Sequence, residues 1–250
     1  MIDAVALRQA VATTWPNLVI HSLSTTSSTQ QVVAEQVAAG ATVPRLVVAD
    51  QQTAGIGRHG HGFVSPAGGV YFTLALPAWA SPLLTPAAGV AMQRAIHQVT
   101  GLQPTLKWVN DVLVADRKVC GILATRVAGH GQARDLIGCG VNLVAPANVP
   151  PADAVPVGGL FPRQPAATVA TALVAAWLTE LANLQAQPAT IMPHYRRHAA
   201  WLNQRVRVQP GRTPIEGTLI GFTATGGLQL QTATGTMTVT TGSLRRIAPA

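Results

Sequence analysis

Four stretches between residues 106 and 144 are rich in the residues that favour β-strands, and only short turns separate most of them. The stretches are Leu106–Val109, Val112–Ala115, Val119–Val127 and Asp135–Val144, with Asp116-Arg117 at a hairpin turn. Strands joined by such short turns run antiparallel, because a parallel pair needs a crossover of a dozen or more residues. The pattern therefore favours a mixed, largely antiparallel sheet of the α/β (α+β) class over a doubly wound parallel sheet.

The remainder of the first 202 residues adds further strands and several helices. The strands are Leu18–Leu23, Arg45–Asp50 and Gly69–Leu76, and Ser24–Thr29 reads as a turn. Apolar spacing predicts a short helix ending before Trp15-Pro16, and further helices over Gln30–Ala39, Thr85–Val99, Ala166–Leu184 and Pro188–Trp201. The Pro-, Ala- and Gly-rich segment Ala145–Pro165 is expected to be a loop.

From Arg205 onward the sequence pattern is that of short β-strands and no longer that of helices. Short alternating strands follow at Val206–Val208, Ile215–Phe222, Gly227–Gln231 and Thr236–Thr240, separated by Pro-Gly and Gly-Gly turn signals. Such a run predicts a small barrel of about five strands. We expect one domain over residues 1–202 and a second over residues 203–250.

Composition narrows the class of protein. Hydrophobic residues make up 48% and charged residues 10% of the chain, yet no uninterrupted apolar run is long enough to span a bilayer. The N-terminus lacks the apolar region of a signal peptide, so we expect a cytoplasmic protein without membrane attachment. Cys120 and Cys139 form no CxxC pair, which favours buried thiols over a zinc site. The net charge of +8 suits phosphate-bearing ligands, acidic partners or nucleic acid.

The loop Gly55–Gly62 carries four glycines around Arg58. Glycines allow the backbone to approach a ligand, successive N–H groups bind anions, and a guanidinium grips a carboxylate or phosphate through two hydrogen bonds. The loop matches neither the P-loop pattern nor the dinucleotide-binding Gly-x-Gly-x-x-Gly followed by a helix. A flexible surface turn is the alternative. His59 and His61 have no nearby cysteine or acidic residue, so a zinc site is not favoured.

A second segment of interest joins Lys107-Trp-Val-Asn-Asp111 to Arg117-Lys118-Val-Cys-Gly-Ile-Leu123. Asn110 and Asp111 offer an amide and a carboxylate for a phosphate-bound Mg²⁺ or a ligand hydroxyl. Lys118 enters an apolar strand after a turn, where its ammonium can neutralise charge on a phosphoryl or acyl centre. An ordinary turn and a lysine that reaches to the surface are the alternatives.

These motifs occur in one order with Ser28-Thr29-Gln30, Gln52, Gly140-Val-Asn142 and Ser243-Leu-Arg245, and the whole succession resembles the biotin protein ligases from about Ser24 to Arg245. The family's Gly-Arg-Gly-Arg-Arg-Gly-Arg is similar to residues 55–61, its Lys-Trp-Pro-Asn-Asp to residues 107–111, and its Arg-Lys-x-x-Gly-Ile-Leu to residues 117–123. Ile56, His59 and His61 replace loop arginines, Val109 replaces the proline, and Gln30 stands where many members have asparagine.

The resemblance implies a catalytic domain similar to class II aminoacyl-tRNA synthetases, followed by an SH3-like barrel. It also implies an enzyme that joins biotin to ATP with Mg²⁺, forming biotinyl-5′-AMP and pyrophosphate, and then biotinylates a lysine of a carrier domain. Arg58 and Lys118 are implied as catalytic. Both are also implied to hold biotin, together with Ser28, Thr29, Gln30, Gln52, Ile56 and Gly57. ATP is implied to meet Arg58, His61, Phe63, Asn110, Asp111, Asn142 and Arg245, with Asp111 facing the metal.

Three rival functions remain. One is a lipoate or other acid-activating ligase of the same fold, against which Lys107–Asp111 and the closing barrel argue. Another is a non-catalytic biotin-binding protein. The third is a DNA-binding repressor, but the segment before Ser24 is too short for a helix-turn-helix, so we expect no specific DNA binding. The expected partner is a biotin carboxyl carrier protein or domain of acetyl-CoA or pyruvate carboxylase; a homodimer is left open.

Overall fold

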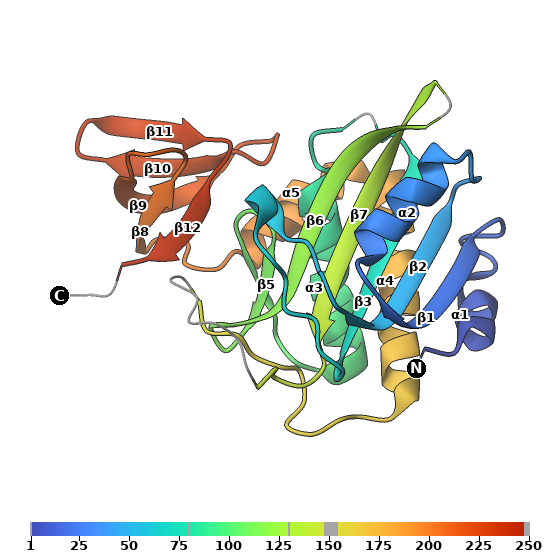
Figure 1. Cartoon of the computed structure of the whole chain (residues 1–250). Helices are drawn as coiled ribbons and strands as arrows, with labels where there is room; N and C mark the ends of the chain where they lie inside the picture. Colours follow the sequence, from blue (N-terminus) through green and yellow to red (C-terminus); the bar gives the residue numbers. More distant parts are fainter. Residues whose placement is uncertain (1, 80, 130, 148–154, 248–250) are drawn as a thin grey trace.

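Two β-sheets organise the chain in the computed structural model, which describes residues 2–79, 81–129, 131–147 and 155–247 (Figure 1). The larger sheet has seven strands in the order β1-β2-β3-β7-β6-β5-β4. Its strands are β1 (Val19–Thr26), β2 (Arg45–Gln52), β3 (Gly69–Pro77), β4 (Thr105–Lys107), β5 (Asp111–Val114), β6 (Arg117–Gly129) and β7 (Gln132–Asn142). Within the described residues only β1 and β2 pair in parallel, which confirms a mixed, antiparallel-rich sheet.

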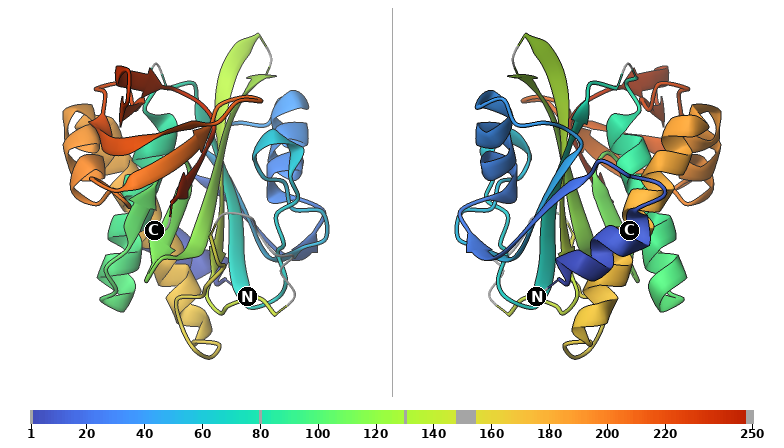
Figure 2. Two further views of the ribbon diagram at one scale, coloured as in Figure 1. Left: turned by 90° about the vertical axis from the view of Figure 1, so that its left-hand side faces the viewer. Right: turned by 90° about the vertical axis from the view of Figure 1, so that its right-hand side faces the viewer.

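Helices cover the two faces of this sheet unequally (Figure 2). The helix α2 (Thr29–Ala38) lies on one face, whereas α1, α3 and α4 lie on the other. Their bounds are Ala4–Val11 for α1, Leu84–Thr100 for α3 and Ala167–Ala186 for α4, and α5 (Ile191–Arg197) packs beside α3. Because α2 is short, it leaves part of its own face uncovered.

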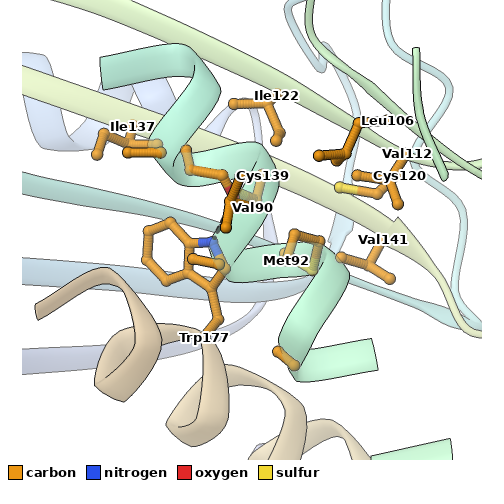
Figure 3. Close-up of a cluster of buried hydrophobic side chains, with 14 of the residues drawn as sticks. Val90, Met92, Leu106, Val112, Cys120, Ile122, Ile137, Cys139, Val141 and Trp177 are labelled. Atoms are coloured by element: carbon orange, nitrogen blue, oxygen red, sulfur yellow. Dashed lines mark hydrogen bonds between the residues drawn. The ribbon is translucent and has the colours of Figure 1, made fainter. Parts of the chain in front are cut away.

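The main apolar core lies between the sheet and the pair α3–α4 (Figure 3). Trp177 of α4 is fully buried there and meets Phe72 of β3 edge to face, at 4.9 Å between ring centroids. Its indole Nε1 donates to the carbonyl of Ala88 at 3.1 Å, so the one polar atom of the ring is satisfied. Within the described residues α4 alone is long and apolar enough to cross a membrane, but half of that stretch is buried in this core.

A smaller core lies under α2. Val33 and Val37 of α2 pack on Val47, Ala75 and Leu136 of β2, β3 and β7. This contact holds α2 over one end of the sheet. The other end of the same face, over β5 and β6, is not covered by α2.

The second sheet has five strands in the order β11-β10-β9-β8-β12, and all of its pairings are antiparallel. The strands are β8 (Arg205–Gln209), β9 (Ile215–Phe222), β10 (Leu228–Thr232), β11 (Gly235–Val239) and β12 (Ser243–Arg246). Several hydrogen bonds attach the sheet to the rest of the molecule, two groups of them from Trp108 and Arg196. Trp108 Nε1 donates to Gly226 O at 3.0 Å, and Arg196 donates twice to Phe222 O, at 3.1 and 2.8 Å. The division into domains at residue 202 stays a prediction.

The predicted elements exist, and the differences lie at their ends. The strand β1 continues to Thr26 through the region predicted as a turn, because Thr25 and Thr26 pair with β2. The helix predicted to reach Trp201 ends at Arg197. Beyond it, the backbone satisfies the edge of β4: Leu106 N donates to His198 O at 2.7 Å, and Ala200 N donates to Leu106 O at 2.9 Å. Strand β12 was not predicted, and part of the predicted loop lies outside the described residues.

Candidate functional site

A cavity of about 680 Å³ occupies the part of the α2 face that α2 leaves open. Its floor is formed by β6 and β7, its sides by the start of α2 and the glycine-rich loop, and its far rim by turns of the second sheet. In Figure 1 the short 3-10 turn η1 (Arg58–Gly60) marks the loop in front of the larger sheet. The sequence-predicted residues that line this one cavity are Ser28, Thr29, Gln30, Gln52, Ile56, Gly57, Arg58, His61, Phe63, Asn110, Asp111, Lys118 and Arg245.

Asn142 is the predicted site residue that does not line the cavity. Its side chain is 4% exposed, and its amide Nδ2 donates to Gly158 O at 3.1 Å. Its carbonyl accepts from Leu160 N at 3.0 Å. Asn142 therefore fastens the segment that follows residue 155 to the end of β7.

A chain of hydrogen bonds lies at the α2 end of the cavity. Gln52 Oε1 accepts from Thr29 N at 2.8 Å, and the hydroxyls of Thr29 and Thr73 are 2.9 Å apart. Thr73 donates to Gln30 Oε1 at 3.2 Å, and Gln30 Nε2 donates to Thr125 Oγ1 at 2.8 Å. The Thr29 hydroxyl also lies 3.2 Å from Gln52 Oε1, to which it can donate, so the two threonine hydroxyls link the two glutamines. The chain fixes the amide orientations of both glutamines.

Ser28 stands apart from this chain. It precedes α2 at the N-cap position, where a serine usually accepts from the first backbone N–H groups, but its side chain makes no such bond. The residue is 1% exposed, and within the described part of the chain its Oγ has no hydrogen-bond partner. A buried hydroxyl left unpaired at a cavity wall is an atom placed to bond a ligand.

The glycine-rich loop brings Arg58 to the boundary between the two sheets. Gly60 has a φ of +75°, which favours glycine, and Gly57 N donates to His61 O at 2.7 Å to close the turn. The Arg58 guanidinium donates to Asn110 Oδ1 at 3.3 Å and to Gly242 O at 3.2 Å. Burial lowers the pKa of Arg58, an effect that the charge of Asp111 opposes. Both acceptors are neutral, so Arg58 keeps its charge for an anionic ligand.

Phe63 lies against the floor of the cavity and not at its rim. A Cβ at Gly121 of β6 would come within 2.8 Å of its ring, and a Cβ at Gly140 of β7 would overlap it. The ring also meets Tyr71 edge to face at 6.4 Å and lies 5.6 Å from Lys118 Nζ. Glycines in two adjacent strands thus make the space that an aromatic side chain enters.

Lys107, Asp111 and Lys118 form a cluster of charges at the β4–β6 end. Asp111 Oδ2 accepts from Lys107 Nζ at 2.8 Å, and Oδ1 lies 2.7 Å from Lys118 Nζ. Burial alone would raise the pKa of Asp111, but the ammonium groups of Lys118 and Lys107 outweigh it and hold that pKa at about 2. The carboxylate is therefore ionised at neutral pH.

This cluster bears on the prediction of Asp111 as a Mg²⁺ ligand. Each of its carboxylate oxygens already faces an ammonium group, and a divalent cation there would lie against two like charges. Among the described residues no three His, Cys, Asp or Glu are grouped to hold a metal ion. Mg²⁺ also retains several waters and seeks accessible carboxylates, whereas Asp111 is 8% exposed. The donor set does not fit a resident Mg²⁺.

The electrostatic character of the cavity follows from its lining. Four side chains carry positive charge, namely Arg58, Lys107, Lys118 and Arg245, against the single carboxylate of Asp111. Such a balance attracts a ligand with two or more negative charges. The cavity thus combines a polar, hydrogen-bonding end near Ser28 with a cationic end between the sheets.

Sequence reasoning missed several contributors. Thr73 and Thr125 orient the glutamines, and their signal is a threonine in an otherwise apolar strand. Residues 209–211 and 242–243 of the second sheet line the rim of the cavity. Their place there depends on tertiary packing, which no local sequence pattern predicts. Lys107 was part of a recognised motif without a role of its own.

Comparison with known proteins identifies a matching family model and several relatives in sequence. The model of the Biotin/lipoate A/B protein ligase family matches residues 22–142. A biotin–[acetyl-CoA-carboxylase] ligase of Mycobacterium tuberculosis is 30% identical over 232 residues, covering 88% of this chain and 85% of that protein. The bifunctional ligase/repressor BirA of Bacillus subtilis is 38% identical over 133 residues, covering 51% of this chain but 40% of its own length. The chain thus spans less than half the length of that bifunctional relative.

Solved structures share the fold. A biotin protein ligase from Aquifex aeolicus in complex with biotin and ATP has a TM-score of 0.77 at 24% identity, covering 92% of this chain and 99% of that one. A biotin protein ligase from Leishmania major in complex with biotinyl-5-AMP has a TM-score of 0.61 at 23% identity, with the same coverage. At these identities the likeness establishes the arrangement of the elements.

Proposed function

Because the chain belongs to the biotin/lipoate A/B protein ligase family, we propose that it is an ATP-dependent biotin ligase. In the first step a carboxylate oxygen of biotin attacks the α-phosphorus of ATP. A C–O–P bond forms, the bond to the β-phosphate breaks, and pyrophosphate leaves. In the second step the amine of a carrier lysine attacks the acyl carbon, an amide forms, and AMP leaves with the bonding electrons.

The observation that carries the proposal is the pairing of a polar end and a cationic end in one cavity. The ureido ring of biotin has one acceptor and two donors. These match the unpaired hydroxyl of Ser28 and the second hydrogen-bonding position on each Gln52 and Gln30 amide atom, whose first position is taken by a protein group. A dithiolane or a plain acyl chain has no such groups. A site built around hydrogen bonds rejects an analogue that lacks them, because its buried polar atoms stay unpaired.

The cationic end suits the reacting groups. A carboxylate and a triphosphate repel one another, and Arg58 and Lys118 lie where both anions would meet, so we assign these two as catalytic residues. Thr29, Ile56 and Gly57 complete the biotin site in this proposal, with His61, Phe63, Asn110 and Arg245 around the nucleotide. We assign Asp111 and Asn142 supporting roles, since their polar atoms bond protein groups.

The proposal extends to features beyond the site. We assign the larger sheet to a catalytic domain of the class II aminoacyl-tRNA synthetase type over residues 1–202, and the five-stranded sheet to an SH3-like barrel over residues 203–250. The partner would be a biotin carboxyl carrier domain, in the cytoplasm, without specific DNA binding or membrane attachment. Mg²⁺ enters only as the counter-ion that accompanies ATP, and no residue of the chain is assigned to it.

A pyrophosphate-release assay tests the function. The purified protein should release pyrophosphate from ATP when biotin is added and should release none without biotin. Lys118→Ala should lower kcat about 10²–10³-fold, the typical effect of losing one charge-stabilising donor, while the protein remains folded. Equal release with lipoate or octanoate would refute the biotin assignment. Biotin binding by calorimetry without any release would identify a binding protein instead.

A further inference from the structure

Lysine is confined to one place in this chain. Of the 17 lysines and arginines in the sequence, all except Lys107 and Lys118 are arginine. The two ammonium groups meet at the two oxygens of one carboxylate, Asp111. Every other positive side chain, including those on the surface, is a guanidinium. The cluster is therefore built from groups that the rest of the molecule does without.

Strand pairing sets the geometry of the cluster. Lys107 of β4 lies opposite Asp111 of β5, and the hairpin between them spans the intervening residues Trp108–Asn110. Lys118 comes from the adjacent strand β6. The Lys107 side chain is 8% exposed and that of Lys118 is 25% exposed. Both side chains line the cavity, and Lys118 is the more exposed of the two.

The charges of the cluster do not cancel. Two ammonium groups and one carboxylate carry a net charge of +1, whereas Asp111 and Lys118 alone would form a neutral pair. In a buried neutral pair the carboxylate would satisfy the Lys118 ammonium completely, and an anionic ligand would have to break that pair. Because Lys107 binds Oδ2, part of the negative charge of Asp111 is neutralised by Lys107, and the remainder only partly neutralises Lys118.

We propose that Lys107 is a positioning residue that acts through Asp111 to hold the Lys118 ammonium in place while leaving it positive toward the ligand. The inference rests on the proposed function, since the anions concerned are the biotin carboxylate and the α-phosphate. The Lys107 ammonium donates to Asp111 Oδ2 and lies 6.0 Å from the centre of the Trp201 ring. Through Asp111 it would set the orientation and the residual charge of Lys118. Asp111 becomes an anchor for two lysines and not a metal ligand.

The first experiment measures Lys107→Met, which keeps the apolar stem and removes the charge. The kcat of biotin-dependent pyrophosphate release should fall about ten- to a hundredfold, the usual cost of misplacing a reacting group. The Kd for biotin, measured by calorimetry, should stay near that of the wild type. A weakened Kd with unchanged kcat would show that Lys107 contacts the ligand itself and would overturn the proposal. Absence of release by the wild type would instead refute the proposed function.

A second variant covers the case in which Lys107→Met does not fold, because it leaves a buried carboxylate with one partner. Lys107→Met combined with Asp111→Asn removes a positive and a negative charge together and keeps Lys118. We expect this protein to fold and to have a kcat reduced to a similar extent, since Lys118 has lost its anchor. A kcat equal to that of the wild type would overturn the proposal.

Arg94→Met supplies the matched control for both variants. Arg94 also forms a partly buried ion pair, with Glu180 at 2.9 Å, but it lies on α3 and does not line the cavity. Its loss should lower the unfolding temperature and leave kcat unchanged at a temperature where the protein is folded. A fall in kcat equal to that of Lys107→Met would mean that general destabilisation explains both, and the positioning role would be rejected.

Discussion

Ser28 shows how a single residue can be poorly placed for the fold and well placed for a ligand. Its hydroxyl is buried, does not cap α2 and has no hydrogen-bond partner within the described residues. Leaving such a group unpaired costs about 1–3 kcal/mol of folding free energy. The same atom would regain that free energy when a ligand supplies an acceptor or a donor.

Ser28→Ala should therefore act in opposite directions on stability and on binding. The unfolding free energy should stay the same or rise, because an unpaired polar atom is removed from the interior. The binding free energy for biotin should weaken by about 1–3 kcal/mol, which raises the Kd roughly 5- to 150-fold. Chemical unfolding and calorimetric titration measure the two quantities. A destabilised variant with an unchanged Kd would show that the hydroxyl supports the fold and not the ligand.

At the scale of elements, the contact between α3 and α5 depends on a neutral histidine. His194 of α5 has Nε2 2.7 Å from Gln93 Oε1 and Nδ1 3.3 Å from Arg94 Nη2. Since Arg94 can only donate, the neutral tautomer with its proton on Nε2 satisfies both contacts. Burial and the nearby charges of Arg94, His198 and Arg197 lower the pKa of His194 from 6.5 to about 4.

Stability should accordingly decrease in mild acid. The unfolded chain takes up this proton near pH 6.5, and the folded chain takes it up only near pH 4, so the contribution is present above about 6.5 and is lost as pH falls toward 4. Because His194 is half-exposed, the loss should be about 1 kcal/mol. Urea unfolding between pH 4 and 7 measures it. His194→Gln should lack this part of the pH dependence, and an identical slope in both proteins would assign it elsewhere.

Local patterns in the sequence accounted for the elements but not for where two of them end. The predicted strands and helices exist because apolar spacing and glycine or proline stops act within a few residues. Arg197 ends α5 because the backbone at residues 198–200 bonds the edge of β4, and that partner is nearly a hundred residues away. The site was predictable where motifs carry it, as at Arg58 and Lys118. The contributions of Thr73, Thr125 and the rim turns could be identified only from the tertiary structure, because tertiary packing brings them to the site.

At the scale of the whole molecule, the two sheets share the site. Arg58 reaches from the glycine-rich loop to Gly242 O, and Asp116 bonds Arg246 at 2.9 Å. Gln209 and Arg245 of the second sheet line a cavity whose floor belongs to the first. A change in the way the sheets pack would therefore change the shape of the site directly.

The distribution of basic residues leads to a prediction about side reactions. If the protein makes an acyl-adenylate, incubation with biotin and ATP but no carrier should leave its own side chains unmodified, because both lysines are ion-paired with Asp111. Intact-mass spectrometry and peptide mapping measure this. Arg212→Lys is the matched control, since it keeps the charge and places an amine at an exposed position beside the cavity rim. That variant should be labelled at residue 212, whereas biotin on Lys107 or Lys118 of the wild type would contradict the prediction.

The confinement of lysine to this pair also affects the chemistry of the protein surface. A mixed anhydride acylates unprotonated amines, and a guanidinium does not lose its proton in proteins. Because the other basic residues are arginine, the chain keeps positive charge for phosphates and offers an escaping acyl-adenylate no lysine amines apart from Lys107 and Lys118. If the acyl group is passed to a carrier lysine as proposed, that lysine would meet no competing lysine amine outside the ion-paired cluster.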